Sequence, residues 1–278
     1  MTPNVLSIAG SDPSGGAGLQ GDLKTISALR GYGMAVVTSL TVQSTTGVSG
    51  VLTVPPDFVA RQIDAVFADI RVDAVKIGML ADAATVRAVV DALDRWAPPV
   101  VVLDPVMVAT SGDRLLTAEA VEVLRSELLP RVDLITPNTA EAAVLLDEPE
   151  VSDPAALSTQ AGHLLRLGCP LVLLKGGHLT GAQSTDVLVG PGLERTLPGP
   201  RVATGNTHGT GCALSSAIAT LRAHGAGWEA AAQEAKAWLT GALRTADQLD
   251  VGRGHGPVHH LSALWATASA GPHGPDDG

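Results

Sequence analysis

The chain has 278 residues, of which 45% are hydrophobic and only 3% aromatic, and it carries a net charge of −10 at pH 7. That length is enough for one large α/β core, which Val, Leu, Ile and Ala must fill because aromatic side chains are scarce. The acidic balance, with a pI of about 5.1, argues against a nucleic-acid-binding protein, which needs a basic surface.

The cysteine content, the N-terminal residues and the lengths of the apolar stretches exclude further classes of protein. Cys169 and Cys212 are too few for a disulfide scaffold or a cysteine-based zinc site. The first residues have neither the charged start nor the apolar run of a signal peptide. No stretch reaches the roughly 18 consecutive apolar residues that a membrane span requires. We therefore expect a cytoplasmic protein without a membrane segment.

The first element is a short apolar strand at 5–10, followed by a glycine-rich loop at 11–18 and a helix over about 17–29. Strand, glycine loop and helix in succession are typical of a phosphate or nucleotide site. The glycine spacing matches neither the Walker lysine motif nor the dinucleotide fingerprint. A turn in which backbone segments approach closely explains the pattern equally well.

Two β-rich segments, 34–43 and 48–54, flank Thr45-Thr46-Gly47 and predict a hairpin or small flap. Strands and helices then alternate. Further strands are expected at 74–79, 100–103, 132–136, 170–174, 186–190 and 194–197, and helices at 59–70, 86–93, 121–128, from 138, and at 154–167, 213–223 and 228–249. This order predicts an α/β fold with a mainly parallel central sheet and helices on both faces. We expect one domain over 1–265 and a disordered tail over 266–278.

Polar residues directly after these strands are candidates for a site, because ligands bind beyond the carboxyl ends of parallel strands. Asp104 is either a partner for Mg²⁺ or part of an Asp-Pro turn. Asn138 and Glu141 share a helix face, where they either line a site or form a capping box. Lys175 is either a donor to phosphate oxygens or an exposed lysine at a strand end.

The segment from Asn206 to Cys212 precedes a helix of small and apolar residues. Its glycines let the backbone amides of Gly209, Thr210, Gly211 and Cys212 converge at the positive end of the helix, which predicts an anion hole. In that field we expect the pKa of the Cys212 thiol to fall. The alternative is a glycine turn with a small buried cysteine. With carboxylates for Mg²⁺ and Lys175 for phosphate, the strand-end set predicts phosphoryl transfer.

Five motifs together resemble the hydroxymethylpyrimidine/phosphomethylpyrimidine kinases of thiamine biosynthesis, in the ribokinase-like superfamily. The motifs are Ala9-Gly10-Ser11-Asp12 with Ser14-Gly15-Gly16-Ala17-Gly18, Val75-Lys76-Ile77-Gly78-Met79, Leu103-Asp104-Pro105-Val106-Met107, Thr136-Pro137-Asn138 with Glu141, and Asn206 to Cys212. The resemblance runs from about residue 4 to 265.

The resemblance implies ATP-dependent phosphorylation of 4-amino-5-hydroxymethyl-2-methylpyrimidine and then of its monophosphate, with ATP and Mg²⁺ as cofactors. It implies that Gln43 recognises the aminopyrimidine, since an amide both donates and accepts hydrogen bonds. It further implies substrate contacts by Asp22, Gly10, Met79 and Val106, nucleotide contacts by Thr207 and Lys236, metal binding by Asp104 and Glu141, and catalysis by Cys212, Gly209, Thr210, Gly211 and Lys175. Simpler alternatives remain for three of these: an edge-strand polar residue for Gln43, ordinary core for Met79, and a solvated helix charge for Lys236.

Cys212 stands where many ribokinase-like sugar kinases have a catalytic Asp, so the resemblance implies a proton acceptor. Gly205, where a basic residue is frequent, and Ser44, where Asn is frequent, depart from the family pattern. The alternatives are a pyridoxal kinase of the same fold and a non-catalytic pyrimidine-binding sensor. Segments 109–113 and 181–184 are candidates for flexible loops, and pairing of the 43–54 strands between subunits, giving a homodimer, is a hypothesis.

Overall fold

The computed structural model describes residues 1–107, 116–177 and 179–269, with the side chains of 267–269 left aside. The strands are β1 (Asn4–Gly10), β2 (Tyr32–Ser44), β3 (Gly47–Thr53), β4 (Ala74–Ile77), β5 (Val101–Leu103), β6 (Leu134–Ile135), β7 (Val172–Lys175), β8 (Asp186–Gly190) and β9 (Leu193–Leu197). The helices are α1 (Gly18–Ala28), α2 (Pro56–Asp69), α3 (Ala83–Trp96), α4 (Ala118–Val123), α5 (Thr139–Leu146), α6 (Leu157–Leu165), α7 (Thr210–Ala223), α8 (Trp228–Arg244) and α9 (Ser262–Ser269).

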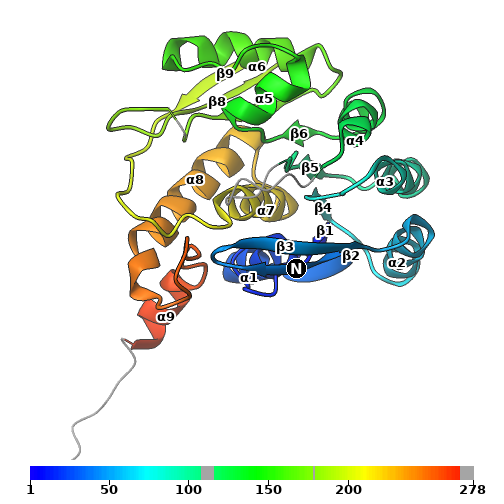
Figure 1. Ribbon diagram of the computed structural model, residues 1–278, viewed down its shortest axis with the longest axis horizontal. Helices are drawn as coiled ribbons and strands as arrows, with labels where there is room; N and C mark the ends of the chain where they lie inside the picture. The colour runs from blue at the N-terminus through cyan, green and yellow to red at the C-terminus, as the bar shows by residue number, and fades with distance from the viewer. Residues whose placement is uncertain (108–115, 178, 270–278) are drawn as a thin grey trace, which may run out of the picture.

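These strands form one sheet in the order β3-β2-β1-β4-β5-β6-β7-β8-β9 (Figure 1). From β2 through β7 all neighbouring strands are parallel, while β3 at one edge and β8 and β9 at the other are antiparallel. The chain goes outward from β1 to β2 and then returns to place β4 on the other side of β1. This reversal makes the β1–β4 boundary the switch point at which open α/β sheets bind ligands.

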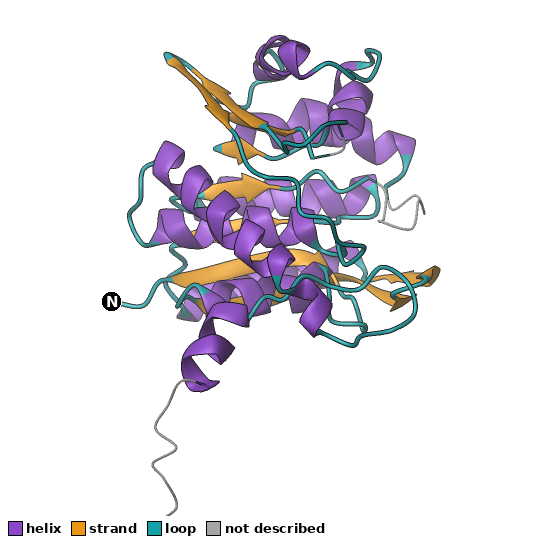
Figure 2. Cartoon of the chain, turned by 90° about the vertical axis from the view of Figure 1, so that its left-hand side faces the viewer, coloured by secondary structure: helices purple, strands orange, loops and turns teal. Residues whose placement is uncertain are grey.

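The sheet is buried on both faces, as parallel sheets are. Alternate residues of each strand face opposite helical layers: Leu6 and Ile8 pack with helices α2 to α6, whereas Val5 packs with α1, α7 and α8. Figure 2 shows helices lying in front of the sheet, viewed from the left-hand side of Figure 1. Each fully buried Val, Leu or Ile stabilises the fold by roughly 1.5–3 kcal/mol, so aliphatic side chains suffice for the core.

The antiparallel β2–β3 pair is the hairpin predicted from the sequence, and its register places Leu40 opposite Leu52. The predicted α/β class and mainly parallel sheet are likewise confirmed.

Two predicted helices end differently from expectation. The helix predicted over 121–128 is α4 followed by a π-helical turn, Leu124–Leu128, and a 3-10 turn that contains Pro130, which has no N–H to continue an α-helix. The last long helix ends as an α-helix at Arg244 rather than near 249, and the chain continues as a 3-10 turn over Ala246–Gln248.

Helix α9 continues to Ser269, four residues past the predicted domain boundary at 265, and residues 270–278 lie outside the described chain. None of the helices in the described parts of the chain is long and apolar enough to cross a membrane.

Candidate active site

A cavity of about 620 Å³ lies at the carboxyl ends of the parallel strands. It is lined by residues that follow β1, β4, β5, β6 and β7 and by the N-terminal end of α7. The predicted residues on its wall are Gly10, Gln43, Met79, Asp104, Val106, Glu141, Lys175, Thr207, Gly209, Thr210, Gly211, Cys212 and Lys236. The polar residues that follow the strands therefore line one cavity.

The N-terminus of α7 forms the anion-binding end of the cavity. Gly209 caps the helix with φ of 82°, and a Cβ at this position would collide with the carbonyl oxygen of Gly16. Glycine is the residue that both adopts this positive φ readily and has no Cβ to collide with Gly16. The Thr210 amide donates to the Thr207 carbonyl, whereas the amides of Gly211 and Cys212 have no acceptor within the helix and can donate to an anion.

Lys175 lies between two buried carboxylates at the same end of the cavity. Its Nζ is 3.1 Å from Oδ1 of Asp104 and 3.8 Å from Oε2 of Glu141. A Cβ on Gly211 would be 3.3 Å from both the Lys175 Nζ and an Asp104 oxygen, which puts the α7 amides beside this charged cluster. Lys175 is thus a partly buried donor at the site rather than an exposed lysine.

Glu141 both lines the cavity and belongs to a capping box, so the two interpretations of this residue are compatible. Its Oε2 accepts from the Asn138 amide at 2.8 Å, and Asn138 Oδ1 accepts from the Glu141 amide, which completes a capping box at the start of α5. Burial raises the pKa of Glu141 to about 7, with Asp104 adding to the rise and Lys175 opposing it. Burial lowers the pKa of Lys175, but Asp104 and Glu141 outweigh it and raise the value to about 12.

The expected fall in the pKa of Cys212 is wrong. Burial raises the pKa of this thiol to about 11, and the charges of Asp22 and Asp104 add to the rise. Lys76 and a hydrogen bond from the Gly18 amide oppose it without overcoming burial. Desolvation of the thiolate therefore outweighs the field of the helix N-terminus.

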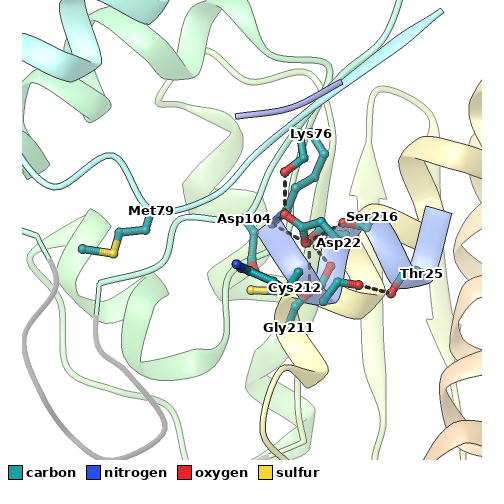
Figure 3. Close-up of polar contacts among 12 residues, drawn as sticks. Asp22, Thr25, Lys76, Met79, Asp104, Gly211, Cys212 and Ser216 are labelled. Atoms are coloured by element: carbon teal, nitrogen blue, oxygen red, sulfur yellow. Dashed lines mark hydrogen bonds and ion pairs between the residues drawn. The ribbon is translucent and has the colours of Figure 1, made fainter. Parts of the chain in front are cut away.

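Asp22 differs from the other predicted substrate contacts, because it does not line the cavity. Its side chain is fully buried behind the wall, where it pairs with Lys76 (Figure 3). Lys76 was not singled out from the sequence, although a lysine within the apolar strand Ala74–Ile77 was an available signal.

A second pair that the sequence did not reveal joins the two glycine-containing loops. Nε2 of His208 is 2.8 Å from Oδ2 of Asp12, and both side chains are buried. Asp12 also accepts hydrogen bonds from the amides of Ser14, Gly16 and Ala17. Burial alone would raise the pKa of Asp12, but the bonds from His208, Ser14 and Ala17 lower it to about 2. The first glycine loop therefore fixes the segment before α7 by close contact, as the simpler interpretation of that loop proposed.

The hairpin end of the cavity carries Gln43 and Met79. Oε1 of Gln43 accepts from the Thr41 hydroxyl at 3.2 Å. The Thr38 hydroxyl donates to the Met79 carbonyl at 2.6 Å, and the Ser39 hydroxyl lies 3.8 Å from its sulfur. Met79 is largely buried but borders the cavity, so it belongs to both the core and the wall.

At the opposite end, Lys236 is not a solvated helix charge, because its Nζ lies 2.6 Å from Oδ2 of Asp186 and both side chains are mostly buried. The guanidinium of Arg201 donates to the carbonyls of Gly177, Leu179, Gly181 and Gln183. The segment 181–184, expected to be flexible, is thus held by one arginine. The other expected loop, 109–113, lies outside the described residues.

The donor set suits a hard cation only in part. Among the described residues, no group of three or more His, Cys, Asp or Glu side chains is placed to hold a metal ion. Asp104 and Glu141 still offer two buried carboxylates beside the anion-binding amides. Mg²⁺ is commonly bound in this way, through one or two carboxylates with the other ligands taken from phosphate oxygens and water.

Comparison with known proteins identifies the class and then the family. The chain superimposes on the pyridoxal kinase of Bacillus subtilis, solved as an ADP complex, with a TM-score of 0.87 and 32% identity over 95% of this chain and 99% of that one. It also matches the phosphomethylpyrimidine kinase of Clostridium difficile 630 with a TM-score of 0.77 and 39% identity, covering 87% of this chain and 100% of that one. Fold and site thus define a ribokinase-like phosphotransferase.

A family model described as phosphomethylpyrimidine kinase matches residues 12–259. The hydroxymethylpyrimidine/phosphomethylpyrimidine kinase of Escherichia coli (strain K12) is 54% identical over 262 residues, which make up 94% of this chain and 98% of that relative. The chain belongs to the phosphomethylpyrimidine kinase family.

Proposed function

We propose that the protein transfers the γ-phosphoryl group of ATP to 4-amino-5-hydroxymethyl-2-methylpyrimidine and then to its monophosphate, supplying the diphosphate for thiamine biosynthesis. One observation carries the proposal. A single cavity holds the N-terminal end of α7, Lys175 and two carboxylates at one end and Gln43 at the hairpin end. The relationship to the E. coli kinase supports the choice of a pyrimidine.

In this proposal the hydroxymethyl oxygen attacks the γ-phosphorus as the bond from that phosphorus to the bridging β–γ oxygen breaks, and ADP leaves. The amides of Gly209 to Cys212 and the Lys175 ammonium hold the charge on the moving phosphoryl group. A loose transition state needs little removal of the hydroxyl proton before transfer. The thiolate form of Cys212 takes that proton, and burial of the thiol raises its pKa to about 11.

Asp104 and Glu141 would hold Mg²⁺ together with the phosphates of ATP. The ion supplies charge neutralisation of the polyphosphate when it is bound. Thr207 and Lys236 complete the nucleotide end of the cavity. Gln43 and Met79 orient the pyrimidine, with Gly10 and Val106 beside them.

A coupled ATP assay tests the proposal with three acceptors in parallel: the hydroxymethylpyrimidine, its monophosphate and pyridoxal. We expect turnover on both pyrimidines. Turnover on neither would overturn the proposal, and turnover on the first alone would restrict it to one phosphorylation.

Pyridoxal phosphorylation is the second candidate, favoured by the likeness to the B. subtilis pyridoxal kinase. A higher kcat/KM for pyridoxal than for the pyrimidine in that assay would select it. A non-catalytic sensor is disfavoured, since such a protein has no use for Lys175 between two buried carboxylates beside the α7 amides.

A homodimer and a cytoplasmic location complete the proposal. Support for the dimer comes from Leu40, Val42 and Leu52 on the hairpin, which are 49%, 65% and 66% exposed. Light scattering should give twice the chain mass of 28.2 kDa, and Leu52→Lys should lower it. A wild-type monomer at micromolar concentration would contradict this part of the proposal.

A further inference from the structure

A buried ion pair lies directly behind the reacting end of the cavity. Nζ of Lys76 is 2.9 Å from each carboxylate oxygen of Asp22, and neither side chain has any exposed surface. Figure 3 shows the two side chains meeting next to Cys212 on α7. Lys76 borders the cavity from the central strand β4, whereas Asp22 does not.

The pair is fixed by two hydroxyl groups. Ser7 on β1 donates to Asp22 at 2.6 Å, and Ser216 on α7 donates to it at 2.8 Å. Ser216 follows Cys212 by four residues, so both lie on one face of α7. Elements β1, β4, α1 and α7 thus hold a single arrangement of the two charges.

Stability does not account for this arrangement. Removing two charges from water costs several kcal/mol for each ion, and buried pairs can often be replaced by apolar residues without loss. The neighbouring backbone also makes room for the ammonium, because a Cβ on Gly78 would be 2.9 Å from Nζ of Lys76. A buried charged group that borders a cleft is a candidate for a functional role.

We propose that Lys76 is a positioning residue for Cys212: its ammonium stabilises the negative charge of the thiolate, and Asp22 holds that ammonium in place. This inference rests on the proposed kinase function. It also gives Asp22 a role different from the substrate contact that the resemblance implied.

Charged groups face the thiol from several elements. Asp22 comes from α1, Lys76 from β4, Asp104 from the end of β5, and Lys175 from β7, while the Gly18 amide donates to the sulfur. Burial has the largest effect on the pKa of Cys212 and raises it, Lys76 lowers it, and the two carboxylates raise it. The two members of the pair therefore act on the thiol in opposite directions, although their loss would damage the fold in the same direction.

Because Lys76 and Asp22 act on the thiol in opposite directions, replacing each of them should change the reactivity of Cys212 in opposite directions. Iodoacetamide alkylation of Cys212 is followed by mass spectrometry between pH 7.5 and 9.5, where the rate is proportional to the thiolate fraction. We expect Lys76→Met to lower the rate at least tenfold and Asp22→Asn to raise it at least threefold, since a shift of one pKa unit is a tenfold change in thiolate. Cys169 in the same sample reports unfolding, because it is 1% exposed.

The matched controls are Arg61→Met and Asp57→Asn, which remove the exposed pair on α2 and should leave the alkylation rate unchanged. If Lys76→Met does not fold, Asp22→Asn still tests the inference, because Asn keeps an oxygen that accepts from Nζ of Lys76 while it removes the opposing charge. Changes of the same sign in the two variants, or a lower rate in Asp22→Asn, would overturn the inference.

A kinetic measurement separates this role from a structural one. Lys76→Met should lower kcat at least tenfold while the KM values for ATP and pyrimidine stay within threefold, because Lys76 acts through Cys212. A rise in KM with unchanged kcat would overturn the inference. Alkylation needs no substrate, so its result does not depend on whether the pyrimidine is the true acceptor.

Discussion

Replacing Asp12 tests the contact that joins the two glycine-containing loops. Its carboxylate is 1% exposed, and its pKa is lowered from 3.8 to about 2. The linkage relation converts that difference into about 2 kcal/mol of folding free energy at neutral pH. Asp12→Asn should therefore lower the free energy of unfolding by about that amount at pH 7.

The pH dependence gives the sharper result. Because the folded pKa is depressed, the contribution of Asp12 is complete above the unfolded pKa of 3.8 and disappears as the pH falls through about 2. The difference between wild type and Asp12→Asn should shrink to about half by pH 3. Urea unfolding followed by circular dichroism at pH 7, 5, 4 and 3 measures it, with the exposed Asp57→Asn as a control.

A difference that stays constant from pH 7 to pH 3 would refute this reasoning, since it would mean that the carboxylate charge is not what stabilises the loops. A difference near zero at pH 7 would also refute it. Turnover should fall as well, because His208, the partner of Asp12, immediately precedes the anion-binding end of α7.

Three further substitutions probe the reacting end of the cavity. Cys212→Ala should lower kcat by about 100-fold and Cys212→Ser by less, because a hydroxyl keeps a proton acceptor in place; wild-type turnover in the Ala variant would remove Cys212 from the catalytic set. Lys175→Met should lower kcat by about 100-fold or more, and an unchanged steady-state rate would contradict its contact with the moving phosphoryl group. Gly209→Ala should lower the free energy of unfolding by about 1–3 kcal/mol, because φ is 82° at this residue and the added Cβ would collide with the carbonyl oxygen of Gly16. Urea titration measures the free energy of unfolding, and a variant as stable as the wild type would contradict the close approach of Gly209 to Gly16.

The sequence predicted the features that depend on local pattern. Alternation of apolar strands and helices gave the sheet, and the polar residues that follow strands, such as Asp104 and Lys175, do converge on one cavity. Both follow from the rule that parallel strands present their carboxyl ends at one edge.

Features that depend on tertiary contacts could not be predicted. Asp12 and His208 are separated by 196 residues, so no spacing in the sequence indicates their contact. The pKa of Cys212 was expected to fall because the helix terminus is visible in the sequence, whereas the burial that reverses the shift is not. The resemblance implies a substrate contact for Asp22, whereas in the structure Asp22 does not line the cavity and is paired with Lys76, which does.

The central claim is that one cavity phosphorylates a pyrimidine twice. Phosphorus NMR of a reaction with ATP, Mg²⁺ and the hydroxymethylpyrimidine tests it most directly. We expect the monophosphate signal to rise first and then fall as the diphosphate appears, with both steps lost together in Lys175→Met. Consumption of ATP without any pyrimidine phosphate, or loss of only one of the two steps in that variant, would contradict the claim.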